Sequence, residues 1–229
     1  MRATTATRSG RVQRGIGQTP PFSGRGSRNA AEDHPRPSIL QLNIEELTNK
    51  ISVIEPLAYK NKAFIIVLQE THSITADKLV IPNFSLARSI LSRNHGLATF
   101  VHERLEWSPV EQPPEQSETE WLCIDVAEYK IVNVYKPPLS RLTPTTIPTF
   151  SHPSLYVGDF NCQHVNWGCN TTSPDGESLD SWAASNNLGL LYIPKETASS
   201  SLAIGTSAPT QTWTSRASAR TANCRTDVS

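Results

Sequence analysis

Short apolar runs that end at polar residues are the feature that most constrains the fold of this chain. Residues 63–68 form an apolar run without alternation that stops abruptly before Gln69 and Glu70. Such a run predicts a strand covered on both faces. An earlier strand is predicted at 39–42, followed by apolar residues at three- and four-residue intervals over 44–58, which predict a helix packed on a sheet.

The same punctuated pattern continues through the middle of the chain. Further strands are predicted at 96–102, 120–126, 130–135 and 154–157, a helix at 178–188, and an exposed loop at 109–119. Sheets covered by helices, with polar residues where strands end, indicate a layered α/β sandwich.

The zero net charge of the 229 residues hides a basic N-terminal segment. Residues 1–37 hold seven arginines against only Glu32 and Asp33, among many Gly, Ser, Thr and Pro residues. Such a segment buries too little apolar surface to offset the entropy of ordering, so we expect a disordered basic arm. The arm either contacts phosphates or assists nuclear entry, or has no selected role.

Several classes of protein are disfavoured. The four cysteines form no CxxC pair, which argues against a zinc site. No apolar run approaches the roughly 20 residues that cross a bilayer, and the N-terminus lacks the apolar core of a secretory signal. We therefore expect a protein of the nucleus or cytoplasm, neither secreted nor membrane-bound, with reduced thiols.

Carboxylates and amides directly follow two predicted strands. Glu70 comes after a buried strand, where an uncompensated charge is costly and a metal ion would offset it. Asp159 and Asn161 follow the strand at 154–157, and their spacing directs both side chains to one side. Mg²⁺ prefers oxygen ligands, keeps several waters and uses one or two carboxylates, so few rigid residues suffice. Each residue alone also fits a solvated loop or an Asx turn.

A tyrosine and a second polar pair add to these candidates. Tyr135 could donate a phenolic hydrogen bond to phosphate, with Lys136 and two prolines forming a stiff basic rim. A core or rim tyrosine explains the same residue. Asn43 and Glu45 carry the same two interpretations at the end of the first strand.

Five segments in order give a more specific indication than any one residue. The segments "LQLNIEEL", "IIVLQET", "HGLATFV", "NVYKPP" and "GDFNCQHVNWG" resemble the endonuclease/exonuclease/phosphatase superfamily, and most resemble the apurinic-type endonuclease domains of non-LTR (LINE-like) retrotransposons. The resemblance covers about residues 38–195. It implies a four-layered α/β sandwich (DNase I-like), DNA as the partner, and Mg²⁺-dependent nicking that leaves a 3′ hydroxyl, with Mn²⁺ as a substitute. It implies no specific protein partner.

The resemblance also assigns roles to the metal-binding and catalytic candidates. By similarity, Glu70 is the principal metal ligand, with Asn43 and Glu45 nearby. Asp159 activates the attacking water, and Asn161 orients the phosphate.

The remaining candidates contact the substrate. By similarity, Tyr135 touches the scissile phosphate, and we expect Lys136, His164 and Asn166 at the substrate. His164, like His95, equally fits a structural or rim position.

The C-terminal part departs from the family pattern. Glu46 stands where relatives often have glycine, and the "PDL"-like and "SDH"-like segments are not recognisable after Pro194. We therefore expect an irregular tail at 196–229 and a sandwich truncated at its C-terminal strands. Residues 208–218 are compatible with codons that encode a family-like segment in another reading frame, which suggests a frameshift.

The missing segment keeps two other functions open. Loss of one transition-state donor commonly costs roughly 10² to 10³ in turnover, so a catalytically inactive relic that at most binds nucleic acid is one alternative. A phosphatase or phospholipase-like enzyme of the same superfamily is another, although "GDFNCQHVNWG" disfavours it.

Overall fold

The computed structural model describes residues 38–47, 50–111, 118–143, 145–191 and 201–205. The predicted basic arm, 1–37, lies outside the described residues. So does the predicted tail, apart from 201–205. No helix in the described ranges is long and apolar enough to span a membrane.

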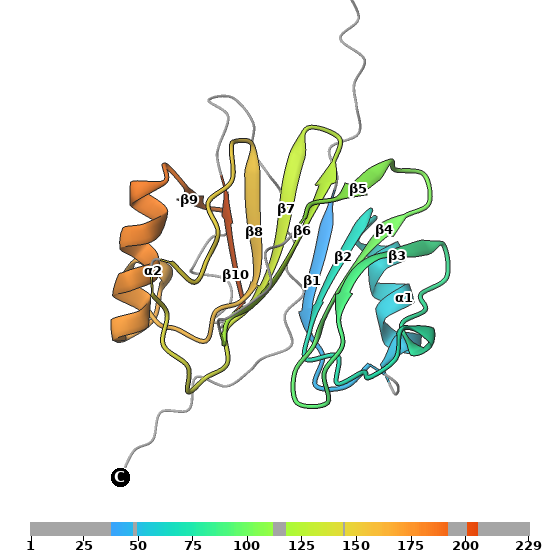
Figure 1. The fold of residues 1–229 in the computed structure, drawn as a ribbon, viewed down its shortest axis with the longest axis horizontal. Helices are drawn as coiled ribbons and strands as arrows, with labels where there is room; N and C mark the ends of the chain where they lie inside the picture. Colours follow the sequence, from blue (N-terminus) through green and yellow to red (C-terminus); the bar gives the residue numbers. More distant parts are fainter. Residues whose placement is uncertain (1–37, 48–49, 112–117, 144, 192–200, 206–229) are drawn as a thin grey trace, which may run out of the picture. The chain divides into compact units, whose positions relative to one another are not determined.

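The described residues form two β-sheets (Figure 1). The first sheet has the order β1 (Ile39–Asn43), β2 (Ile65–Gln69), β4 (Leu97–His102) and β3 (Phe84–Ile90). The second has the order β5 (Trp107–Pro109), β6 (Glu120–Val126), β7 (Tyr129–Tyr135), β8 (Ser154–Asp159), β10 (Ser201–Gly205) and β9 (Gly189–Leu190).

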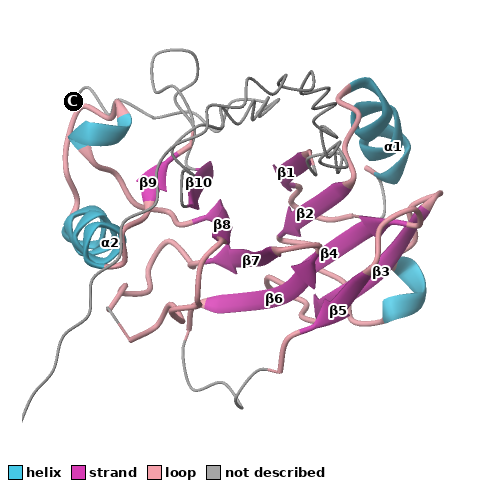
Figure 2. Cartoon of the chain, turned by 90° about the horizontal axis from the view of Figure 1, so that it is seen from above, coloured by secondary structure: helices cyan, strands magenta, loops and turns pink. Residues whose placement is uncertain are grey.

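The two sheets pack face to face, and each carries a helix on its outer face. Alternate residues of β2 point in opposite directions, because successive side chains of a strand face opposite sides. Ile65 and Val67 join the core between the sheets, whereas Ile66 and Leu68 pack in the core beneath α1 (Ile51–Lys60). α2 (Pro174–Ser185) covers the second sheet, and Figure 2 shows the two helices on opposite outer sides. The predicted α/β sandwich is confirmed.

Two parallel strand pairs bring strand ends together. In the first sheet β1 pairs with β2, which places Asn43 opposite Gln69. In the second sheet β7 pairs with β8, which places Tyr135 opposite Asp159. Gly158 allows this second pair to approach closely, since a Cβ there would lie 1.8 Å from the carbonyl oxygen of Val134.

The structure corrects the prediction of an irregular tail at one place. Residues 201–205 form β10, which pairs antiparallel with β8 and with β9. The tail has little apolar periodicity, so its pattern did not predict a strand. The edge of β8 nonetheless offers unpaired backbone groups that a following segment can satisfy.

Two short 3₁₀ helices complete the described elements: η1 (Ala76–Lys78) and η2 (Val165–Trp167). β3 was also not predicted, because Ser85, Arg88 and Ser89 interrupt its apolar residues. These polar residues are compatible with a strand at the edge of the first sheet.

Candidate active site

Four side chains from the ends of four strands form one hydrogen-bonded network. Asn43 ends β1, Glu70 follows β2, Tyr135 ends β7 and Asp159 ends β8. The amide nitrogen of Asn43 donates to Glu70 Oε1 at 2.9 Å and to Asp159 Oδ2 at 2.9 Å. The hydroxyl of Tyr135 donates to Glu70 Oε1 at 3.0 Å. The network therefore joins the two sheets at the C-terminal ends of these four strands.

The composition of the strands explains why this polar group lies here. Residues at every second position of a strand share one face. On β8, the core between the sheets contains Leu155 and Val157, and Asp159 follows at the next position of the same face. On β7, Ile131 lies in that core and Tyr135 ends the same face. Each inner face thus changes from apolar to polar as it reaches the site.

The backbone at the site is held in strained turns. Glu70 has φ +54° and Asn161 has φ +43°, both in the left-handed region that few non-glycine residues adopt. Such residues cost of order 1–3 kcal/mol each and persist where their surroundings fix them. Around Glu70, its carbonyl accepts from the Glu46 N–H at 2.8 Å, and the Thr71 N–H donates to the Gly96 carbonyl at 3.1 Å. The Glu70 side chain is therefore presented by a fixed turn.

The donor set fits a hard divalent cation. Two carboxylates share one amide, Asp159 is only 3% exposed and the Glu70 side chain is 19% exposed. Burying two negative charges together is costly unless a cation offsets them. The Oδ1 atom of Asn43 is buried and has no hydrogen-bond partner among the described residues, so an oxygen ligand is at hand.

The described residues form no large protein cage for a metal ion. In the part of the chain that the structure describes, no group of three or more His, Cys, Asp or Glu residues could hold a metal ion. Glu70, Asp159 and Asn43 instead supply few oxygens at one point. This suits Mg²⁺, which retains several waters and takes one or two carboxylates.

Tyr135 is held as a hydrogen-bond donor. Burial, together with the neighbouring negative charge of Glu70, raises the pKa of the Tyr135 phenol well above its ordinary value. The phenol therefore keeps its proton through the neutral range. The ring of His95 packs against it with centroids 5.2 Å apart, and His72 Nε2 lies 3.9 Å from Glu70 Oε2.

Asn161 lies next to the network and is hydrogen-bonded to the Asp159 side chain and to the Lys136 backbone. Its N–H donates to Asp159 Oδ1 at 3.1 Å, and its side-chain nitrogen donates to the carbonyl of Lys136 at 2.9 Å. The Lys136 N–H in turn donates to the Asp159 carbonyl at 2.9 Å. The turn after β8 and the segment after β7 are thereby held together.

Two predicted site residues are not drawn into the network. Glu45 is 80% exposed at its side chain, and its carboxylate lies 3.9 Å from Lys50 Nζ. Lys136 is fully buried, and its Nζ lies 3.0 Å from Asp175 Oδ2. The prediction that Lys136 forms part of a stiff basic rim is therefore wrong, because its charge is paired inside the protein.

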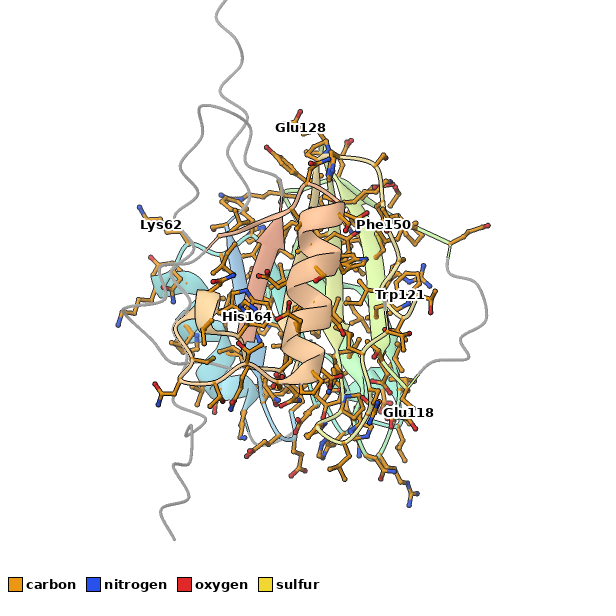
Figure 3. The ribbon with its side chains drawn as sticks, turned by 90° about the vertical axis from the view of Figure 1, so that its left-hand side faces the viewer. Lys62, Glu118, Trp121, Glu128, Phe150 and His164 are labelled. Carbon is orange, nitrogen blue, oxygen red and sulfur yellow. The ribbon has the colours of Figure 1, made fainter. Side chains whose placement is uncertain are left out.

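The two remaining candidates, His164 and Asn166, have contacts of a different kind, and Figure 3 shows His164 beside α2. The Nδ1 atom of His164 accepts from the Asn166 N–H at 3.1 Å and so caps η2. The His164 ring packs on Trp167 with centroids 5.2 Å apart, and its Nε2 lies 3.4 Å from Glu177 Oε2. These contacts give His164 a structural position, while Asn166 is exposed.

A buried polar layer beneath the site was not predicted. The Asn133 side chain accepts from Gln69 Nε2 at 2.7 Å and donates to the carbonyls of Leu68 and Ala98 at 3.2 Å. Gln69 and Asn133 are both fully buried and belong to different sheets. The signal for them was present, because each is a lone amide within or at the end of an apolar run.

Comparison with known proteins supports this fold. Residues 129–228 match the sequence model of the family described as endonuclease-reverse transcriptase. No curated protein matches the chain significantly. Among solved structures, the endonuclease domain of TRAS1, a telomere-specific non-LTR retrotransposon, is 14% identical with a TM-score of 0.55, over 75% of this chain and 85% of that chain. An AP endonuclease from Archaeoglobus fulgidus is 12% identical with a TM-score of 0.50, over 75% and 87% respectively.

Proposed function

We propose that the chain carries a domain of the endonuclease/exonuclease/phosphatase superfamily and that it hydrolyses phosphodiester bonds in DNA with the help of Mg²⁺. Members of this superfamily are hydrolytic nucleases and phosphatases. The proposal rests on one observation, the hydrogen-bonded network of Asn43, Glu70, Tyr135 and Asp159 at the C-terminal ends of β1, β2, β7 and β8.

Glu70 and Asn43 are the residues that would hold the metal ion. The Glu70 carboxylate is fixed by a strained turn, and the buried Oδ1 of Asn43 has no partner among the described residues. A bound Mg²⁺ supplies charge neutralisation at the phosphate and polarises water. Asp159 lies within the same network, so its charge stabilises a cation there.

The other residues act on protons and on the phosphate. Asp159 accepts the proton of the attacking water, since its carboxylate is held by Asn43 and by the Asn161 N–H. When substrate is bound, Tyr135 turns its hydroxyl hydrogen from Glu70 Oε1 to a non-bridging phosphate oxygen, and its raised pKa keeps it protonated. Asn161 orients the phosphate from the turn beside Asp159.

DNA is the substrate that the similarities favour. The TRAS1 relative is described as the endonuclease domain of a non-LTR retrotransposon, and the second relative as an AP endonuclease. Nicking that leaves a 3′ hydroxyl is the reaction that we propose for this chain. The proposal includes Mn²⁺ as a substitute for Mg²⁺.

The test uses the full chain with supercoiled plasmid DNA and Mg²⁺. We expect conversion to the open-circular form, which EDTA and Asp159→Ala each abolish. Asp125→Asn is the control, because Asp125 forms a partly exposed ion pair with Lys130 at the far end of β7. An unchanged plasmid would indicate a catalytically inactive relic. Release of phosphate or phosphocholine from inositol phosphates or sphingolipids, without nicking, would indicate a phosphatase or phospholipase.

A further inference from the structure

One buried ion pair lies beside the network without belonging to it. The Lys136 side chain is fully buried, and its Nζ lies 3.0 Å from Asp175 Oδ2 and donates to the Pro137 carbonyl at 3.1 Å. Burying an ammonium group is costly unless a well-placed partner and further hydrogen bonds compensate. The ammonium has both, so it is not available to substrate.

The same carboxylate holds both ends of the loop 136–142. Asp175 Oδ2 pairs with Lys136 at the start of the loop, and Asp175 Oδ1 accepts from the Leu142 N–H at 3.1 Å at its end. Inside the loop, the Pro137 carbonyl accepts from both the N–H and the hydroxyl of Ser140, at 3.2 and 2.9 Å. The loop is thus closed by its own hydrogen bonds, and the Asp175 carboxylate fixes both of its ends.

Asp175, which holds the loop, is itself fixed at the start of α2. Asp175 lies in the first turn of α2, where the Ser173 hydroxyl caps the helix by accepting from the Gly176 N–H at 3.1 Å. A Cβ at Gly176 would lie 1.9 Å from the Gln163 carbonyl oxygen, so the helix start packs tightly on the preceding segment. A carboxylate in the first helical turn is also favoured by the helix dipole.

The backbone of Lys136 connects this point to the proposed catalytic residues. Lys136 directly follows Tyr135, its N–H donates to the Asp159 carbonyl at 2.9 Å, and its carbonyl accepts from the Asn161 side chain at 2.9 Å. A displacement of Lys136 would therefore move Tyr135, Asp159 and Asn161 together.

We infer that the Lys136–Asp175 pair is a positioning device, which anchors the segment after β7 to α2 and so aligns Tyr135, Asp159 and Asn161. The inference rests on the proposed function, and it gives Lys136 a role that does not include contact with the substrate. Asp175 acts through Lys136 and is likewise a positioning residue.

The experiment compares Asp175→Asn, Lys136→Met and the double variant, using a duplex oligonucleotide substrate with Mg²⁺. A misplacement of about 1 Å can cost roughly 10²-fold in rate, so we expect kcat of each single variant to fall by about that factor, with KM changed less than about twofold. Asp175→Glu should restore part of kcat. Asp125→Asn, which breaks the Lys130 pair, should leave kcat unchanged.

The double variant separates positioning from stability. Removing both charges leaves no uncompensated buried ion, so its melting temperature should recover towards that of the unaltered protein. We expect kcat to stay low, because the anchor is still missing. Recovery of kcat together with stability would overturn the inference, as would a Lys136→Met variant with raised KM and unchanged kcat, which would indicate substrate binding.

Amide hydrogen exchange provides a readout that does not depend on catalysis. In Asp175→Asn the Lys136 amide should exchange faster, while the Val132 amide within β7 is unchanged. If the unaltered protein does not cleave DNA but this difference appears, the proposed function fails and the anchor stands. If DNA is cleaved and neither kcat nor the exchange of Lys136 changes, the anchor fails alone.

Discussion

Replacing Asn133 with leucine should destabilise the protein more than its size change suggests. Asn133 is fully buried between the sheets, where it accepts from Gln69 Nε2 at 2.7 Å and donates to Leu68, Ala98 and Thr99. Leucine leaves the buried Gln69 amide without its acceptor. An unsatisfied buried polar group costs about 1–3 kcal/mol, and the lost donations add to this. We therefore expect the free energy of unfolding to fall by about 2–4 kcal/mol.

The measurement is urea unfolding of the variant and of a double variant that also carries Gln69→Leu. Replacing both partners of a hydrogen bond with apolar groups is often nearly neutral. The two changes together should therefore cost less than the sum of the single costs, and Asn94→Leu at an exposed position serves as the control. A loss below about 1 kcal/mol for Asn133→Leu, or strict additivity, would refute the reasoning.

Three further predictions concern the site and its support. Gly158→Ala should destabilise the protein by about 3 kcal/mol or more, measured by urea unfolding, because the new Cβ would lie 1.8 Å from the Val134 carbonyl oxygen. Mg²⁺ at about 100 times its Kd should stabilise the unaltered protein by about 2.7 kcal/mol in thermal unfolding; an equal shift in Glu70→Gln would contradict the assignment of Glu70. Burial opposes the charge of Asp175, but the Leu142 N–H, Lys136 and Arg141 together hold the pKa of its carboxyl below the ordinary value. The resulting stabilisation is present above about pH 4 and is lost as the pH falls further, so acid should lower the urea midpoint of the unaltered protein more than that of Asp175→Asn.

Local patterns predicted the strands that carry the network and the positions at which they end. Glu70 and Asp159 each follow an apolar run. The sequence indicates where such a strand ends, because the change from apolar to polar residues is local. The structure brings both carboxylates to Asn43. Their catalytic roles stay predictions until activity is measured.

The features that the sequence did not predict depend on contacts between distant segments. The burial of Lys136 requires Asp175 from α2, so the neighbours of Lys136 in sequence suggested a basic rim instead. The turn at Glu45, with φ +44°, directs its side chain towards solvent and Lys50. β10 forms because β8 offers a free edge for pairing. That edge exists only in the assembled sheet, so the composition of the tail could not predict the strand.

Because the network is divided between two sheets, the proposed activity requires both sheets to be folded and packed together. Asn43 and Glu70 belong to the first sheet, whereas Tyr135 and Asp159 belong to the second. Neither half on its own brings the proposed metal ligands, proton acceptor and phosphate contact to one place. Under the proposed function, a chain in which only one half has folded should not cut DNA, and the ability to cut should arise only when the two sheets pack together.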